Sequence, residues 1–266
     1  MDSGIFLRGI QGRPSLYRKT RRRASWFSRV LIGVAALGGA GIVPAFAADT
    51  YWDAGVGDWS TGTNWDTGIR PSVLDNAIVD NGGTAQIAAG AGANSIYGYL
   101  GYSASGSGSV KVDGAGSAWT NSWHLTVGDS GSGSLDISNG GTVSNRAGLV
   151  GYEAGSDGSV TVDGADSIWT NSSILEVGKF GSGSLEITNG GAVIVNSFGY
   201  VGYEAGGNGS VTVDGAGSAW ANSYELTVGG SGSGSLDITN GGAVGNRVGY
   251  VGYEAGGNGS VTVDGA

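Results

Sequence analysis

The sequence predicts an all-β fold, a right-handed parallel β-helix (β-solenoid) with coils of about 25 residues. The main observation is the phrase Gly-Ser-Val followed by Val-Asp-Gly-Ala, whose first Val recurs at steps of 50, 51 and 50 residues, at Val110, Val160, Val211 and Val261. A related phrase, Gly-Ser-Leu-x-Ile-x-Asn-Gly-Gly, lies midway between the copies and reduces the step to 25 or 26 residues. A short fixed period indicates a solenoid, because each turn then buries its apolar face against its neighbours.

Composition supports this prediction and narrows the class of protein. Gly makes up 56 of the 266 residues, Pro only 3, and Cys is absent. The glycines follow no three-residue period, which excludes a collagen-like chain. Val, Leu, Ile and Trp recur in fixed register, which a flexible Gly/Ser linker does not require. Such a chain is expected to build a regular surface, and this argues against a catalytic pocket.

Residues 1–47 are predicted to form a signal peptide with an extended basic segment. Eight Lys and Arg residues stand against one Asp before the apolar run at residues 30–43, and Ala-Phe-Ala then ends at Ala47. A basic segment, an apolar segment and small residues in that order are typical of a secretory signal, so we expect cleavage between Ala47 and Ala48. An uncleaved anchor is the alternative, although the apolar run is short for a membrane span.

Removal of this segment changes the charge of the remainder. Eight of the 13 cations and one of the 22 acids are lost, so the formal net charge falls from −9 to −16. Five cations remain and are expected to be scattered: Arg70, Lys111, Arg146, Lys179 and Arg247. Without a basic patch for phosphate contacts, nucleic-acid binding is excluded. An acidic exterior suits solubility outside the cell.

Two regions follow the signal peptide. Residues 48–96 contain a cluster of Trp52, Trp59 and Trp65 and are predicted to form an N-terminal cap and the first coils, because an uncovered solenoid end exposes strand edges. Residues 97–266 are predicted to be solenoid repeats that are truncated at the C-terminus, since the chain stops within a repeat.

One coil is expected to contain three short strands of three to five residues. Val160 and Val162 alternate with polar residues, which is the pattern of a strand with one buried face. Residues 168–170 form the second predicted strand and residues 175–177 the third. Gly, Asn or Asp is expected to end each of them.

Stacking the coils predicts continuous columns of equivalent side chains about 4.8 Å apart. The two aliphatic columns pass through Val160 and Val162. Asp113, Asp163, Asp214 and Asp264 should alternate with Ser138, Thr188 and Thr239, whose hydroxyls donate to the carboxylates. Trp119, Trp169 and Trp220 should alternate with Val143, Val193 and Val244.

A further column is predicted to be an Asn ladder, in which amides bond along the axis. Its members are Asn121, Asn145, Asn171, Asn222 and Asn246. The coil at Val193 breaks this spacing by one residue and also contains the single 26-residue step, so a bulge or a longer corner is expected there.

The residues suggest no catalytic, cofactor-binding or metal-binding site. His124 is the single His and has no evident partners, so a structural role is expected. Nearly every acid occupies a repeat position, which indicates a structural role, whereas the two acids of a glycosidase would be expected at unique positions. Tyr152, Tyr203 and Tyr253 form a candidate row of outward surface contacts. The alternative is that these rings cover a corner of the solenoid.

The phrases VGYEAGGNGSVTVDGAGSAWANS and LTVGGSGSGSLDITNGG resemble the repeat of type V secretion autotransporter passengers and of some PEP-CTERM surface proteins, over residues 97–266. The resemblance implies an exported β-helix at the cell surface or outer membrane of a Gram-negative bacterium, or a secreted one, with a structural or adhesin-like role. It implies no catalytic residues. A C-terminal barrel or PEP-CTERM anchor is not recognisable, so membrane association is expected only through such a missing part.

Two classes of function follow from the sequence. The first is a non-catalytic passenger that binds a repetitive glycan or a host or matrix protein through repeated weak contacts. The alternative is a secreted glycan-active lyase or hydrolase whose active site lies outside this fragment. Active sites of β-helix enzymes are usually built from long irregular loops inserted between the strands. The coils of this chain carry almost no insertions, so the first class is favoured.

Overall fold

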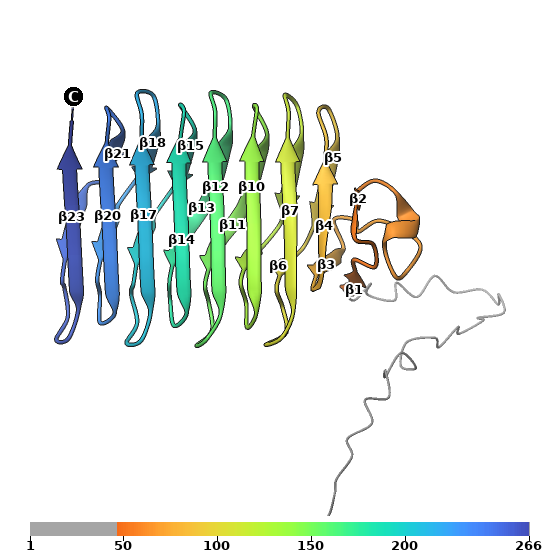
Figure 1. Cartoon of the computed structure of the whole chain (residues 1–266), viewed down its shortest axis with the longest axis horizontal. Helices are drawn as coiled ribbons and strands as arrows, with labels where there is room; N and C mark the ends of the chain where they lie inside the picture. The colour runs from red at the N-terminus through yellow and green to blue at the C-terminus, as the bar shows by residue number, and fades with distance from the viewer. Residues whose placement is uncertain (1–46, 266) are drawn as a thin grey trace, which may run out of the picture. The chain divides into compact units, whose positions relative to one another are not determined.

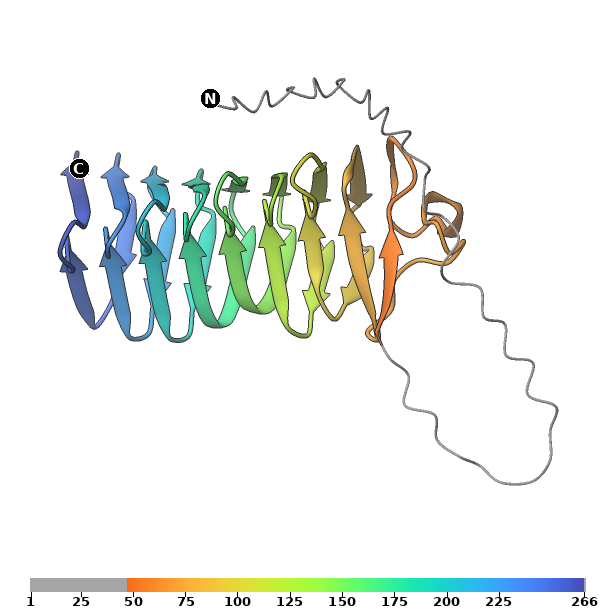
Figure 2. The same cartoon turned by 90° about the horizontal axis from the view of Figure 1, so that it is seen from below.

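The computed structural model describes residues 47–265, so all but the last residue of the predicted signal peptide lies outside the described residues. Every ladder between the strands named below is parallel, and equivalent residues of successive coils are direct partners. The predicted parallel β-solenoid is therefore confirmed. Figures 1 and 2 show the coils stacked along one axis, with β1 and β2 at one end and β23 at the other.

The first of three faces is a nine-stranded sheet with one strand per turn. Its strands are β2 (Val56–Asp58), β4 (Asn81–Ile87), β7 (Ser107–Asp113), β10 (Ser132–Ser138), β12 (Asp157–Asp163), β14 (Ser182–Thr188), β17 (Asn208–Asp214), β20 (Ser233–Thr239) and β23 (Asn258–Asp264). Figure 1 shows most of them side by side as the front layer.

The remaining strands form a 14-stranded sheet that divides into a second and a third face. The second face contains β5 (Gly92–Ser95), β8 (Ala118–Asn121), β15 (Ala192–Val195), β18 (Ala219–Asn222) and β21 (Ala243–Gly245). The third face contains β1 (Ala48–Tyr51), β3 (Asp75–Val79), β6 (Gly98–Leu100), β9 (His124–Val127), β16 (Phe198–Val201) and β22 (Val248–Val251), with β19 (Glu225–Val228) between the last two. β11 (Thr142–Val150) and β13 (Ile168–Val177) belong to both faces.

The strands differ in length from the prediction. Most first-face strands have seven residues, because pairing begins three residues before the predicted Val or Leu. The predicted second and third strands of one coil are joined in the ten-residue β13. The chain passes the corner between them, Asn171-Ser172-Ser173, without a break in the strand. β11 makes the same passage with a register shift between Asn145 and Ala147.

The core consists of the predicted aliphatic and Trp/Val columns. Val160 pairs with both Leu135 and Leu185, and all three side chains are buried. On the second face Trp169 pairs with Val143 and Val193, so large and small side chains alternate and fill one layer. The same columns are open in the last coil, where Val261 is 41% and Val263 is 73% exposed.

The column of Asp and hydroxyl residues at the end of the first-face strands is confirmed. Ser138, Thr188 and Thr239 each donate a hydrogen bond to the Asp of the preceding coil, over 3.0, 2.8 and 2.6 Å. Following Asn side chains donate to the same carboxylate oxygen, as Asn189 does to Asp163. These bonds lower the pKa values of Asp113 and Asp214.

The predicted Asn ladder forms at only one step among the described residues. Its one bond between Asn amides runs from Asn145 Nδ2 to Asn171 Oδ1, at 2.6 Å. The carbonyl oxygens instead accept from neighbours that compete for them: Trp169 Nε1 donates to Asn145 Oδ1 at 2.7 Å, and Ser95 Oγ to Asn121 Oδ1 at 2.5 Å. Val195 occupies the ladder position between Asn171 and Asn222 and interrupts the column.

The expected irregularity in the 26-residue coil is a longer corner. β15 ends at Val195 and β16 begins at Phe198, whereas β11 runs through the equivalent corner without a break. The extra residue therefore lies in Asn196–Ser197, between the second and third faces, and leaves the first-face register intact.

Three Trp side chains cover the N-terminal end of the core. Trp65 makes edge contacts with Trp52 and Trp59, at centroid distances of 5.0 and 4.7 Å, and Trp59 lies 5.1 Å from Trp119 of the first Trp column. All four are buried. The short 3₁₀ helix η1 (Gly62–Asn64) is part of this region. Among the described residues, no helix has the length and apolar character needed to cross a membrane.

A candidate contact surface on the third face

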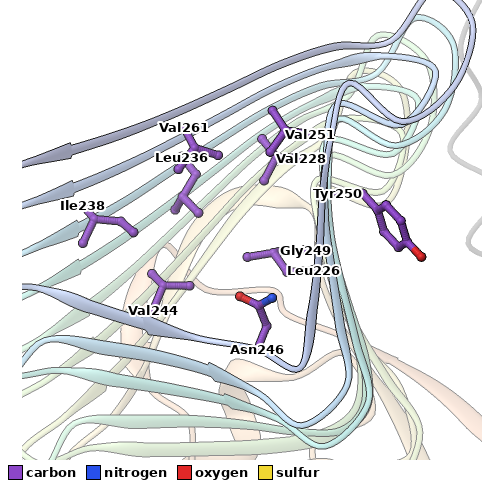
Figure 3. A pocket seen from close by; sticks show the side chains of 10 residues that line it. All are labelled: Leu226, Val228, Leu236, Ile238, Val244, Asn246, Gly249, Tyr250, Val251 and Val261. Carbon is purple, nitrogen blue, oxygen red and sulfur yellow. The ribbon is translucent and has the colours of Figure 1, made fainter.

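The outer side of the third face carries side chains at alternate strand positions. In β9, Leu125 and Val127 point into the core, so His124 and Thr126 lie on the outer side. Tyr99, Tyr200 and Tyr250 occupy the same column as Thr126 in other coils. Figure 3 shows the Tyr250 ring on the outer side of the ribbon, away from the core residues.

The predicted row of tyrosines lies at the corner between the third and first faces. Tyr152 N donates to Gly128 O and Tyr253 N to Gly229 O, so these residues follow equivalent turns. Gly151 and Gly202, before Tyr152 and Tyr203, have φ of 68° and 62°, a conformation that Gly adopts without strain. Tyr253 is exposed, whereas Tyr152 and Tyr203 are half-buried, so the rings are accessible and also cover the corner.

The tyrosine row continues at Tyr102, which occupies the equivalent corner two coils before Tyr152 and belongs to a larger aromatic cluster, here called cluster 1. Tyr97 stacks on Tyr99 at a centroid distance of 6.0 Å, and Tyr99 meets the edge of Tyr102 at 5.0 Å. His124 contacts Tyr97 at 5.6 Å and Trp123 at 6.2 Å. Trp123 is 43% and Tyr102 is 42% exposed, so cluster 1 presents two accessible rings beside the half-buried Tyr97 and Tyr99.

Cluster 2 has the same arrangement 101 residues later in the sequence. Phe198 stacks on Tyr200 at 6.1 Å, and Tyr200 contacts Tyr203 at 4.3 Å. Phe198 also contacts Tyr224 at 5.4 Å, and Tyr224 is 46% exposed. Phe198, Tyr200, Tyr203 and Tyr224 thus correspond to Tyr97, Tyr99, Tyr102 and Trp123 of cluster 1.

Three of the five expected scattered cations lie along this face, which corrects the expectation. Arg146 covers the Trp123 ring at 4.4 Å, and Arg247 covers the equivalent Tyr224 ring at 5.4 Å. Lys179 lies 5.1 Å from the Tyr152 ring. An aromatic face attracts a cation, and this attraction gathers charges that are far apart in the sequence.

Burial changes the acid–base properties of the clusters. It raises the pKa of Tyr99 and of Tyr200 to about 12, with Asp129 and Glu225 adding to the effect. Both phenols therefore stay protonated and can donate hydrogen bonds. Burial, and then Arg146, lowers the pKa of His124, which favours the neutral ring.

Glu176 lies between the two clusters, in the same column as Tyr200. It is buried, and burial raises the pKa of its carboxyl although Lys179 partly opposes this. Lys179 Nζ is 3.2 Å from Glu176 Oε2, an ion-pair contact without good hydrogen-bond geometry.

Sequence reasoning found the tyrosine row but missed the clusters. Their signal is a second period of 101 residues, visible in NSIYGYLGY and NSFGYVGY and again in NSWHLTV and NSYELTV. The repeat between the two clusters has Ala147, Leu149 and Ser173 at the positions of the aromatic residues. A search for a period of 50 residues therefore misses the period of 101 residues.

The remaining candidates for a site among the described residues are metal-binding groups, cavities and the predicted cleavage site. The described residues contain no group of three or more His, Cys, Asp and Glu side chains placed to hold a metal ion. A cavity of about 260 Å³ is the open end of the core, where Leu236, Val244 and Val251 converge (Figure 3). A second hollow of about 280 Å³ lies on the Ser- and Gly-rich first face. At the predicted cleavage site, Ala47 is exposed and Ala48 is the first residue of β1.

Comparison with known proteins adds little. No protein-family model and no curated protein matches the chain. Among solved structures it is similar to the crystal structure of a TibA fragment hyper-glycosylated by TibC, with 19% identity over 83% of this chain and 82% of that one, at a TM-score of 0.22. The fold described above therefore rests on the strand pairing of this chain itself.

Proposed function

We propose that the protein is an exported, surface-located β-solenoid passenger with an adhesin-like role, and that the third face is its contact surface. The observation that carries this proposal is the pair of equivalent aromatic clusters on one rigid face. Accessible Trp and Tyr side chains with Arg beside them are the residue types that dominate binding energy at interfaces. The signal-peptide pattern and the resemblance of the repeats to autotransporter passengers support export to the surface of a Gram-negative bacterium, or secretion.

We further propose that the chain is not an enzyme. The two cavities described above are an open core end and a hollow on the first face, and neither brings a buried acid, base and nucleophile together. Binding by such a surface is weak at each contact and gains strength from repetition, so the partner is itself repetitive, a glycan or a matrix protein.

The test is a deletion series in which pairs of coils are removed from the C-terminal end and binding to immobilised glycans and matrix proteins is measured. We expect affinity to fall in steps, with the largest loss when residues 198–224 are removed, because cluster 2 goes with them. Unchanged affinity after that deletion would contradict the contact surface. Release of new reducing ends from any glycan would contradict the absence of catalysis.

A further inference from the structure

We infer that clusters 1 and 2 are paired subsites for one extended, neutral glycan chain that lies along the solenoid axis. This inference rests on the proposed contact surface and specifies its ligand.

The spacing of the clusters is the first argument. Tyr99 and Tyr200 belong to one column and are separated by Thr126, Leu149 and Glu176, which is four coils. At about 4.8 Å per coil, the clusters are about 19 Å apart and related by translation along the axis. A ligand that contacts both in the same way must present the same chemistry twice at that spacing. A linear polymer of identical units does this.

The groups within each cluster are the second argument. The face of an aromatic ring is electron-rich and attracts polarised C–H groups, such as those on one side of a pyranose. The phenols of Tyr99 and Tyr200 and the guanidinium groups of Arg146 and Arg247 can donate to ring or hydroxyl oxygens. A sugar offers an apolar side and a hydroxyl edge together. The column between the two rings holds Thr126, Leu149 and Glu176, so the aromatic contacts are separate and suit a ligand that repeats its units.

Charge decides between neutral and acidic glycans. Three cations lie along the third face, whereas its corners and outer side carry six carboxylates: Asp129, Glu153, Glu176, Glu204, Glu225 and Glu254. The chain after residue 47 has a formal net charge of −16. This field repels polyanions such as uronic-acid polymers, whereas hydroxyl groups can donate to the carboxylates.

The midpoint between the clusters is also suited to a continuous chain. Tyr152 lies two coils from Tyr102 and two from Tyr203, so the tyrosine row has a ring about every 10 Å. Lys179 beside the Tyr152 ring supplies a donor there. In this middle repeat Ser173 occupies the position of Trp123 and Tyr224, so the midpoint has no exposed ring at that position.

The experiment measures binding of the full chain to neutral oligosaccharides by calorimetry, using cello-, xylo-, manno- and chito-oligosaccharides from disaccharide to octasaccharide. We expect at least one series in which affinity rises steeply once the chain reaches from one cluster to the other, because the second contact becomes intramolecular. Trp123→Ala and Tyr224→Ala should each lower long-chain affinity by about 10-fold or more and leave disaccharide affinity nearly unchanged at half the stoichiometry. Both side chains are exposed, so the fold should tolerate these changes.

A gain-of-contact variant and a matched control sharpen the test. Ser173→Tyr should place a ring midway and move the rise in affinity to shorter chains. Ile194→Ala, an exposed change on the second face, should leave all affinities unchanged. The inference is overturned if no neutral series binds, if affinity does not depend on chain length, or if polygalacturonate binds more tightly. Adhesion to matrix protein that both cluster substitutions abolish, without binding of any neutral glycan, would overturn the glycan inference and leave the proposed contact surface intact.

Discussion

Trp220 is the residue whose surroundings differ most from those of its equivalents. The indole N–H of Trp119 donates to Ser95 Oγ at 3.1 Å, and that of Trp169 donates to Asn145 Oδ1. At the same place Trp220 meets Val195, and its Nε1 has no partner among the described residues. Both amide atoms of the neighbouring Asn222 are also unpaired. Val195 thus leaves Trp220 Nε1 and Asn222 Oδ1 without the partners that Ser95 and Asn145 provide in other coils, whereas Nδ2 is unpaired in Asn121 and Asn171 as well.

Val195→Asn should therefore stabilise the protein by about 1 kcal/mol, since the new amide can accept from Trp220 and bond to Asn222. The side chains are similar in volume, so little repacking is needed. Urea unfolding followed by circular dichroism measures the difference. Val193→Asn, in the apolar Trp/Val column of the same strand, is the control and should destabilise. A loss of stability in both variants would contradict this account of the column.

Glu176 gives a prediction about pH. Because burial raises the pKa of its carboxyl, the folded state favours the protonated form more than the unfolded chain does, and ionisation of Glu176 costs stability as the pH rises from the unfolded-state pKa to the folded-state pKa. Glu176→Gln should therefore be more stable than the parent at pH 7, by about 1 kcal/mol. The advantage should shrink as the pH falls towards the ordinary glutamate value of 4.5. Equal stability of the two chains at every pH, measured by thermal unfolding, would show that Lys179 fully compensates the buried charge.

Among the elements, the first-face strands are those whose buried side chains could be predicted from the repeat period alone. Position in a coil determines burial there, because each Val or Leu pairs with its equivalent without a register shift between β7 and β23. The corners could not be predicted in the same way. Whether the chain bends at Asn171 or continues as β13 depends on tertiary pairing with β11, which no local residue signals.

The same limit applies to the candidate surface. The tyrosine row follows from one repeat phrase, but the clusters combine residues from a corner, a strand and the next coil. Their formation requires the register between coils, which differs from the simple period where corners change length. The Asn ladder is limited to one bond for a related reason: equal spacing brings the amides together, but Trp169 donates to the Asn145 oxygen and Ser95 to the Asn121 oxygen.

Two substitutions compare the inner and outer sides of these elements. Val160→Asp should cost several kcal/mol, because β12 would bury an unpaired carboxylate in the aliphatic column. Tyr203→Ala should cost much less, since that ring is half-buried at the corner. Denaturant titration of both variants gives the comparison. Equal losses would mean that the inward and outward assignments are wrong.

At the scale of the whole molecule, the solenoid combines a dry, stacked core with a long face that repeats its aromatic groups. A rigid stack keeps the clusters at a fixed separation, so the protein itself loses little conformational entropy when a long ligand binds. The Trp side chains at the N-terminal end cover the core and leave the third face free.

Export is the whole-molecule property that the N-terminal sequence predicts. We expect cleavage after Ala47, so that mass spectrometry of exported protein finds Ala48 at the N-terminus. Such a cut keeps β1 whole, because β1 begins at Ala48 and pairs with β3 from that residue. Intact Met1 on exported material would contradict the prediction.

The most direct test of the central claim, that the third face is the contact surface, is quenching of Trp fluorescence. Trp123 is exposed, whereas the other six Trp residues of the described chain are at most 2% exposed. In a Trp26→Phe chain, acrylamide should therefore quench mainly Trp123. We expect a bound neutral oligosaccharide to protect this fluorescence, and Trp123→Phe to remove both the quenchable fraction and its protection. Saturating ligand that leaves the quenching of Trp123 unchanged would contradict the account.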